Sequence, residues 1–299
     1  MPTKRETEFW MQVTRRTHQL QPDMNRAVLA MLRDIRAYLT DDAVAEVVRS
    51  GSVDETINTL LSDARLTAAG NRVRLALLTT LLSGGTFALD RVPRSAGRRP
   101  TFNVLGPQLV ETLRTLDQKM MAVFRSELVA VIRNELTAII QAGVPARTAG
   151  TRVRATVGLT PRQAQEVAQF RVTRAATPMT RGAMLSETQV ERMTQAYRDR
   201  RIAINTDVIT RTATSDAFKA GQFLAMTQVV AAGILLSGSL VKTWVNMGDG
   251  RVRDEHSNRG GMGGQTVPWN NRYSNGDMIP GESTWNCRCV SYYSILSSL

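Results

Sequence analysis

The stretch that decides the fold lies near the C-terminus. It reads LVKTWVNMGDGRVRDEH at residues 240–256 and, after a glycine-rich run, WNCRCV at residues 285–290. Both cysteines of the chain, Cys287 and Cys289, stand here as a C-x-C pair, together with His256, one of only two histidines. Three of the four tryptophans also fall in this region. The rare residue types are therefore concentrated in one small part of the chain.

This region has the pattern of a small module of strands and turns. β-Branched and aromatic runs predict strands at 240–247, 266–269 and 287–293. Pro268 places the second strand at a sheet edge, because proline cannot donate a ladder hydrogen bond. One or two helical turns are expected at 253–258. Such a module buries little apolar surface, so its stability is expected to depend on a cross-link or on a partner.

The cysteines and His256 allow three interpretations. The first interpretation is a structural zinc site, because cysteine and histidine are common zinc ligands, with Asp254 or Asp249 as the fourth ligand. Against zinc, C-x-C is not the usual C-x2-C spacing, and three ligands do not complete a structural site. The second interpretation is a pair of buried thiols hydrogen-bonded to His256, and the third is a redox pair. Apart from this zinc, no cofactor is expected.

The ordered motif resembles the C-terminal domain of phage Mu F-type head morphogenesis proteins, most strongly over residues 209–290. That family more often carries glutamate where Ala213 stands. The residues that carry the resemblance are Lys242, Trp244, Asp249, Arg251, Val252, Arg253, His256, Gly264, Val267, Pro268, Pro280, Gly281, Asn286, Cys287, Arg288 and Cys289.

The resemblance implies a structural protein of the virion rather than an enzyme. Such a minor head protein lies inside the capsid near the portal, in multiple copies, and aids head assembly and DNA packaging or delivery. Its implied partners are the portal protein, a scaffold or the major capsid protein, and double-stranded DNA bound without sequence preference.

Composition limits the number of domains and the compartment in which the protein is made. The 299 residues are enough for two domains, and the formal net charge is +12. No apolar run approaches the roughly 20 residues that a membrane helix needs, and the polar, basic N-terminus lacks the apolar core of a signal peptide. Two cysteines one residue apart do not make a secreted disulfide framework. We therefore expect synthesis in the host cytoplasm and no membrane partner.

The positive charge is concentrated in the middle of the chain. Residues 91–181 hold 15 Lys and Arg against 5 Asp and Glu. Clustered arginines suit phosphate and attract nucleic acid without reading its sequence, and the alternative is that they pair with acids or lie on solvated helix faces. The predicted DNA contacts are Arg147, Arg152, Arg154, Arg162, Arg171 and Arg174.

The rest of the chain has helical periodicity, so the predicted fold class is mainly α with a small C-terminal α+β module. Four segments are predicted: a helical N-terminal domain at 1–90, an Arg-rich helical region at 91–185, a long helix at 186–236 and the Mu F-like module at 237–299.

Local signals predict where several helices begin and end. A polar arm is expected before a helix that begins at Pro22. Thr40 is expected to cap the next helix, and Ser52 and Ser186 are expected to begin capping boxes. Gly84 is expected to end a helix.

Two other function classes remain. A metal-dependent DNA-processing enzyme would use His256 with Asp249, Asp254, Glu255 and Glu282. A DNA-binding regulator would use the helix pair at 146–175, although two packed helices of a bundle give the same pattern. The sequence contains no phosphate-binding loop motif, so it gives no indication of a site for nucleotide hydrolysis.

Overall fold

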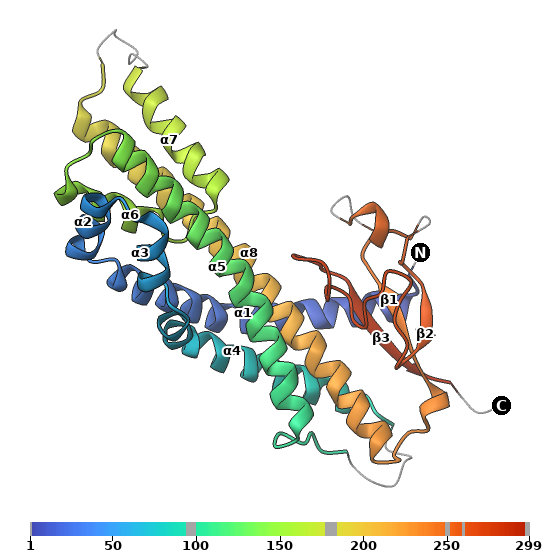
Figure 1. Ribbon diagram of the computed structural model, residues 1–299. Coiled ribbons are helices and arrows are strands. Elements are labelled where there is room, and N and C mark those ends of the chain that lie inside the picture. Colours follow the sequence, from blue (N-terminus) through green and yellow to red (C-terminus); the bar gives the residue numbers. More distant parts are fainter. Residues whose placement is uncertain (1, 94–99, 177–183, 249–251, 259–260, 297–299) are drawn as a thin grey trace. The chain divides into compact units, whose positions relative to one another are not determined.

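The computed structural model describes residues 2–93, 100–176, 184–248, 252–258 and 261–296, apart from the side chains of residues 56, 146 and 147. Within these ranges, eight α-helices precede a small antiparallel sheet (Figure 1), which confirms the predicted fold class. The helices are α1 (Lys4–Tyr38), α2 (Asp41–Ser50), α3 (Val53–Leu60), α4 (Asp63–Leu89), α5 (Pro107–Gln141), α6 (Ala146–Thr156), α7 (Pro161–Ala176) and α8 (Glu187–Ala231). None of these helices is long and apolar enough to cross a bilayer.

The chain forms two compact units, each built from separated stretches. The first comprises Met1–Met24, Arg74–Gln118 and Ile209–Leu299, and the second comprises Asn25–Val73 and Lys119–Val208. Helices α1, α4, α5 and α8 therefore contribute residues to both units. The four consecutive segments expected from the sequence do not correspond to these two units, and their division stays a prediction.

In the first unit, two glycines let α4 and α8 approach closely. A Cβ on Gly84 would lie 2.0 Å from the backbone oxygen of Phe218, and a Cβ on Gly221 would lie 2.0 Å from that of Leu81. The rings of Phe87 and Phe218 pack beside this crossing, with centroids 5.3 Å apart. The prediction that Gly84 ends a helix is wrong, since α4 continues to Leu89 and uses the glycine for packing.

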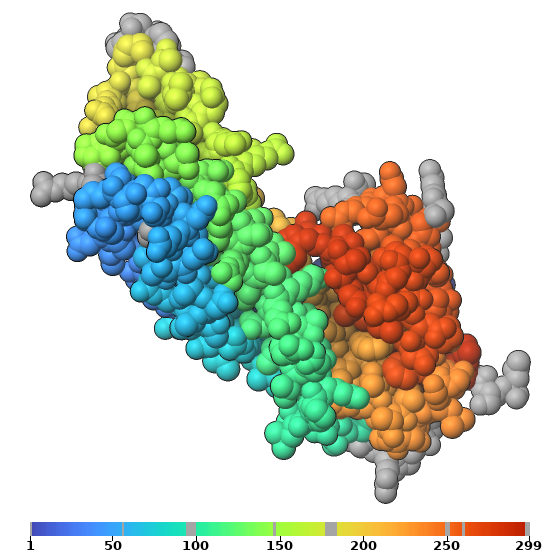
Figure 2. All heavy atoms as spheres, viewed as in Figure 1, coloured from blue at the N-terminus to red at the C-terminus, as the bar shows by residue number. Residues whose placement is uncertain are grey.

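The sheet of the first unit has the order β2-β1-β3. Its strands are β1 (Leu240–Val245), β2 (Thr266–Pro268) and β3 (Val290–Ile295), and both pairings are antiparallel. β2 lies at an edge, as the proline at its end predicts. The central strand carries Trp244, which is fully buried. In the space-filling view, the described residues of the strands and of the loops between them lie together, coloured orange to red (Figure 2).

In the second unit, α2 packs against α6. A Cβ on Gly150 of α6 would lie 2.1 Å from the Asp41 carboxylate and 3.1 Å from its Cα, so a larger residue would displace the Asp41 side chain. Gly158 follows α6 with a φ of +95°, which glycine adopts without strain. Asn205 of α8 donates a 3.1 Å hydrogen bond to the Gly158 carbonyl and fixes this turn.

The predicted helix ends had mixed outcomes. Thr40 caps α2 by accepting a hydrogen bond from Ala43 N, and Ser186 forms the predicted capping box with Gln189. Ser52 makes no side-chain cap, so that prediction is wrong. The expected start at Pro22 is also wrong, because Pro22 lies inside α1. An interior proline costs about 3 kcal/mol, and burial of the apolar face on both sides of it offsets that cost.

Candidate metal centre in the C-terminal module

His256 lies in a loop that the side chain of Asn246 holds by hydrogen bonds. It ends the short 3-10 helix η3 (Asp254–His256), after β1 and before the glycine run. The side chain of Asn246 donates to the His256 carbonyl and to Asn258 Oδ1. Gly263 lies against this network, since a Cβ there would meet Asn258 at 2.0 Å. The glycine-rich run is thus needed where the loop closes over the Asn246 side chain.

The two cysteines reach the same point from the segment before β3. Asn286 has a φ of +61°, the only positive φ at a non-glycine residue in the described chain, and it turns the backbone into the cysteine pair. Arg211 of α8 donates a 3.1 Å hydrogen bond to Asn286 Oδ1. A left-handed conformation is several-fold enriched in asparagine, which accounts for the residue type before Cys287.

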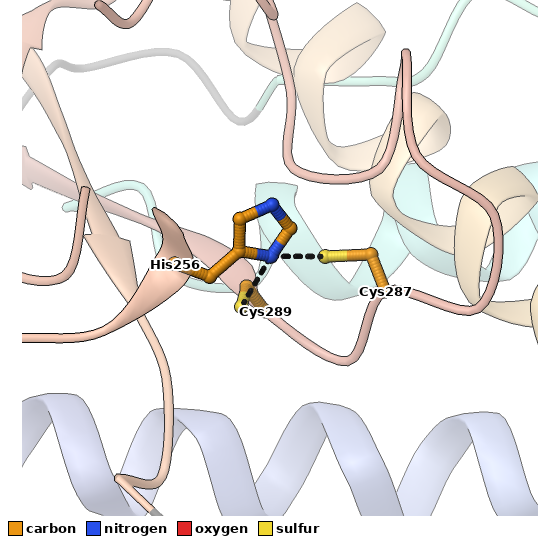
Figure 3. A group of neighbouring side chains, drawn as sticks. All are labelled: His256, Cys287 and Cys289. Carbon is orange, nitrogen blue, oxygen red and sulfur yellow. Dashed lines mark hydrogen bonds between the residues drawn. The ribbon is translucent and has the colours of Figure 1, made fainter. Parts of the chain in front are cut away.

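The two sulfur atoms point toward one nitrogen of His256 (Figure 3). Nδ1 lies 3.6 Å from Cys287 Sγ and 3.7 Å from Cys289 Sγ. All three ligand atoms lie within 4.8 Å of one another, and all three residues are buried. The cysteines are not joined in a disulfide. The sequence prediction that these three residues share a site is therefore supported by their positions.

The neighbouring carboxylates take other places. Of the two acids expected as a fourth ligand, Asp254 is exposed and does not join the cluster, and Asp249 lies outside the described residues, so the expectation of a fourth acidic ligand stays untested. Glu255 Oε1 lies 3.8 Å from Nε2, the other ring nitrogen of His256. Glu282 pairs with Arg272 at 3.3 Å. Among the acids of the enzyme hypothesis that the structure describes, Glu255 alone approaches His256.

The two thiols are electrostatically different. The pKa of Cys287 is lowered to about 4, first because Cys289 donates a hydrogen bond to it, and further because His256 and Lys219 favour the thiolate over the opposing effect of burial. The same hydrogen bond and burial raise the pKa of Cys289. A thiolate is the form that binds metals, so one ligand of the cluster is already favoured in its binding state.

A buried ion pair on α8 lies behind the cysteines. Lys219 Nζ is 3.2 Å from Asp216 Oδ1 and 3.4 Å from the Cys287 carbonyl oxygen. Burial lowers the pKa of Lys219, but Asp216 and the two sulfurs outweigh it, so the net pKa is raised. Gly281 packs onto the pair, since a Cβ there would lie 3.0 Å from Lys219 Nζ.

The sequence pattern did not predict this ion pair. The available signal was a lysine and an aspartate three residues apart within an otherwise small and apolar stretch of α8, ATSDAFKAGQF. Such a spacing places both side chains on one face of a helix, but it does not reveal that the face is buried.

A cavity of about 210 Å³ adjoins the cluster. Its lining includes His256 and both cysteines, and the cationic side chains Arg211 and Arg253 also face it. Arg253 donates a 3.0 Å hydrogen bond to the carbonyl of Trp285. The cluster is thus buried by protein on most sides and reaches a polar cavity on one side.

The N-terminal part of α1 also meets this site. Trp10 lines the cavity, and its Nε1 donates a 3.0 Å hydrogen bond to the Arg288 carbonyl, between the two cysteines. The N-terminal stretch, expected as a polar arm before the helix, is instead the first part of α1. Trp10 and Phe9, the apolar anchors in that stretch, pack against the apolar cluster around Val290 at the start of β3.

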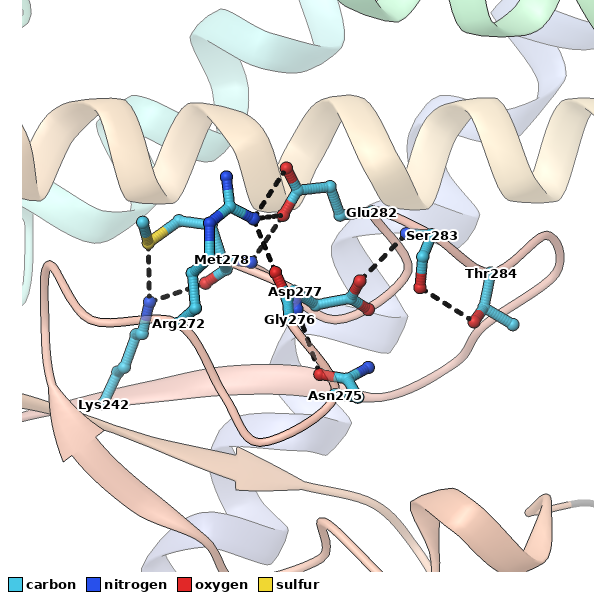
Figure 4. A network of polar contacts seen from close by, with 9 residues as sticks. All are labelled: Lys242, Arg272, Asn275, Gly276, Asp277, Met278, Glu282, Ser283 and Thr284. Atoms are coloured by element: carbon cyan, nitrogen blue, oxygen red, sulfur yellow. Dashed lines mark hydrogen bonds and ion pairs between the residues drawn. The ribbon is translucent and has the colours of Figure 1, made fainter.

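Lys242, which belongs to the motif, is a second buried cation. From β1 its ammonium donates to the carbonyl of Met278 at 2.6 Å and to the sulfur of the same residue at 3.1 Å (Figure 4). It also lies over the rings of Tyr273 and Phe223, at 5.0 and 5.4 Å from their centroids. Burial lowers the pKa of Lys242 to about 8.

The other motif residues build the surrounding loops. Pro280 and Gly281 are buried, and the loop before them is held by Arg272, which donates to the Gly276 carbonyl. Trp244 packs edge-on against the rings of His256 and Tyr273, both at 5.0 Å. Asp249 and Arg251 of the motif lie outside the described residues.

The arginines predicted to contact DNA are engaged in local contacts of the second unit. Arg162 pairs with Glu166 and is 89% exposed, and Arg171 lies 3.4 Å from Glu191. Arg174 lies over the ring of Phe170.

The remaining arginines of this set lie on or near α6. Arg152 pairs with Glu135 and Arg154 pairs with Asp41, both at 2.8 Å. The side chain of Arg147 is outside the description. Several of these pairs are surface pairs, which contribute little to stability and leave the guanidinium able to exchange partners.

Comparisons of this chain with protein-family models, with curated proteins and with solved structures found no match. The resemblance to the Mu F-type family therefore rests on the motif residues alone.

Proposed function

We propose that this protein is a minor head protein of the phage Mu F type, a structural component of the virion. One observation carries the proposal: the motif residues pack into one another. Lys242, Trp244, His256 and the two cysteines are all buried in the same module, where each contacts at least one other motif residue or the loops between them. A motif used to fold a docking module is expected to have this arrangement.

The proposed place of the protein is inside the capsid near the portal, in multiple copies. Its head partners would be the portal protein, a scaffold or the major capsid protein. The Arg-rich helices α6 and α7 would lie close to packaged double-stranded DNA. A field of arginines suits non-specific phosphate contacts, because such contacts depend on charge rather than on a shaped site.

Purified particles provide the direct test. We expect the protein to remain with particles through density-gradient purification, and imaging to locate it on the inner side of the portal. Absence from particles, together with no binding between the purified protein and the portal protein, would overturn the proposal. Binding to the outer capsid surface would contradict the proposed location.

A metal-dependent DNA-processing activity is the alternative. The cavity beside His256 is the feature that favours it, since it gives small molecules access to the cluster. A nuclease assay with added divalent metal, comparing the unaltered protein with His256→Ala, separates the two proposals: cleavage that disappears in the variant would favour the enzyme.

A further inference from the structure

Two sulfur atoms share one ring nitrogen, Nδ1 of His256. A ring nitrogen has either one hydrogen to donate or one lone pair to accept with, in a single in-plane direction. Here two sulfurs, of Cys287 and Cys289, lie at nearly equal distances of 3.6 and 3.7 Å from that one nitrogen. Hydrogen bonds within the cluster account for these contacts in pairs, whereas one ion between the three atoms accounts for all of them together.

The spacing of the three atoms matches a zinc site. Zinc binds sulfur at about 2.3 Å and histidine nitrogen at about 2.0–2.1 Å in a tetrahedron, which places a sulfur and a nitrogen ligand about 3.5–3.6 Å apart. The observed distances of 3.6 and 3.7 Å agree with this value. All three ligand atoms also fall within 4.8 Å of one another without any change of side-chain position.

We propose that His256 Nδ1, Cys287 Sγ and Cys289 Sγ bind one zinc ion in each chain. These three residues line the cavity of about 210 Å³, which leaves room for a fourth ligand beside them. Binding releases the protons of any thiol still protonated, since zinc takes cysteine as the thiolate. The proposal goes beyond the proposed function and does not depend on it.

Glu255 is placed to position the ligand. Its carboxylate lies 3.8 Å from His256 Nε2, the nitrogen that points away from the sulfurs. Metal-binding histidines usually donate their other ring N–H to a carboxylate or carbonyl, which fixes the tautomer that leaves the first nitrogen free for the metal. At 3.8 Å the contact is longer than a hydrogen bond, so Glu255 would position the ring through a small side-chain shift or a bridging water rather than act as a ligand.

Three protein ligands leave one coordination position of the zinc open, but the ion would still cross-link the small module. It joins η3, which follows β1, to the segment that leads into β3, where cysteines and histidine are 31 and 33 residues apart in sequence. A metal that closes such a loop contributes its binding free energy to folding, because the unfolded chain holds no preformed site. The C-x-C spacing is accommodated by the turn at Asn286, which lets both sulfurs face one way.

The test is the metal content of the full-length protein purified without chelators or metal-affinity resin. Elemental analysis should find about one zinc per chain in the unaltered protein and in His18→Ala, the matched control at the other histidine. His256→Ala and Cys287→Ser should each lose it. Glu255→Gln should keep the site but weaken zinc binding by about tenfold or more, without changing the thermal midpoint of the metal-free protein.

A second measurement guards against variants that fail to fold. The unaltered protein, stripped of metal and shown by circular dichroism to keep its helices, is titrated with Co²⁺ alone. We expect the visible absorption of a four-coordinate cobalt with thiolate ligands, abolished by one equivalent of Zn²⁺. Folded protein that contains no zinc and gives no cobalt spectrum would overturn the proposal, and so would a mass two hydrogens below that of the free dithiol.

Discussion

Lys219 Nζ lies 3.2 Å from Asp216 Oδ1 on the same face of α8, and the two side chains are only 2% and 8% exposed. The lysine also reaches the Cys287 carbonyl at 3.4 Å, so the pair connects the long helix to the cysteine segment within the first unit. Burying an ion pair is costly, and removing one partner leaves the other charge in a medium that solvates it poorly.

Lys219→Met is therefore expected to lower the free energy of unfolding by about 3–5 kcal/mol. Denaturant unfolding followed by circular dichroism measures the change. The double variant Lys219→Met with Asp216→Leu should recover much of the loss, because it removes both buried charges. A loss in the single variant below about 1 kcal/mol would mean that the pair is not desolvated as described.

Lys242 should make stability depend on pH. Its folded-state pKa of about 8 is below the unfolded value of about 10.4. Between these pH values the unfolded chain holds a proton that the folded chain has released, so the free energy of unfolding should rise with pH. Below about pH 8 both states are protonated and this dependence should vanish.

The measurement compares urea unfolding of the unaltered protein and Lys242→Met between about pH 7 and 10, where the rise should be smaller in the variant. Lys4→Met, at an exposed lysine, is the control and should behave like the unaltered protein. Values above about pH 10 are left out because burial raises the pKa of Tyr273 in the folded state. There the unfolded chain loses the tyrosine proton while the folded chain keeps it, so the free energy of unfolding falls as pH rises. Identical slopes in both proteins would contradict the prediction.

The crossing of α4 and α8 should not tolerate a methyl group. In Gly221→Ala the new Cβ would lie 2.0 Å from the Leu81 backbone oxygen and 2.9 Å from Gly85 N, so the helices must separate. We expect a net loss of about 1–3 kcal/mol, although alanine is normally the better helix former. Gly238→Ala is the control, because nothing lies within 4 Å of a Cβ there. Thermal unfolding of both variants is the measurement, and equal midpoints would refute the close approach.

If the proposed function holds, the arginines of α7 should contribute to DNA binding through charge alone. Replacing Arg162, Arg171 and Arg174 together by glutamine should weaken binding to duplexes of any sequence, and reduce the slope of log affinity against log salt by about one per lost contact. The control is Arg49→Gln on α2, an exposed arginine that also pairs within its own helix. Fluorescence anisotropy over a range of salt concentrations measures both quantities. An unchanged slope would place the DNA contacts elsewhere or exclude them.

Much of the fold was predictable because it depends on local pattern. The three strands, the edge position of β2 and the long α8 follow from period, β-branched content and turn residues that lie close together in sequence. The helix ends were less predictable. Pro22 is a strong local stop signal, yet α1 continues through it because the packed face on either side contributes more than the proline costs.

The candidate site was predictable in its members but not in its form. The sequence by itself determined which residues are available: two cysteines and one histidine in a module too small to be stable without help. Only the tertiary structure decided that both sulfurs face one ring nitrogen, that Asp254 stays outside, and that Lys219 and Trp10 reach the cysteine segment. The reason is physical: local preferences act over a few residues, whereas these contacts join positions from 31 to 278 residues apart and exist only once the chain has packed.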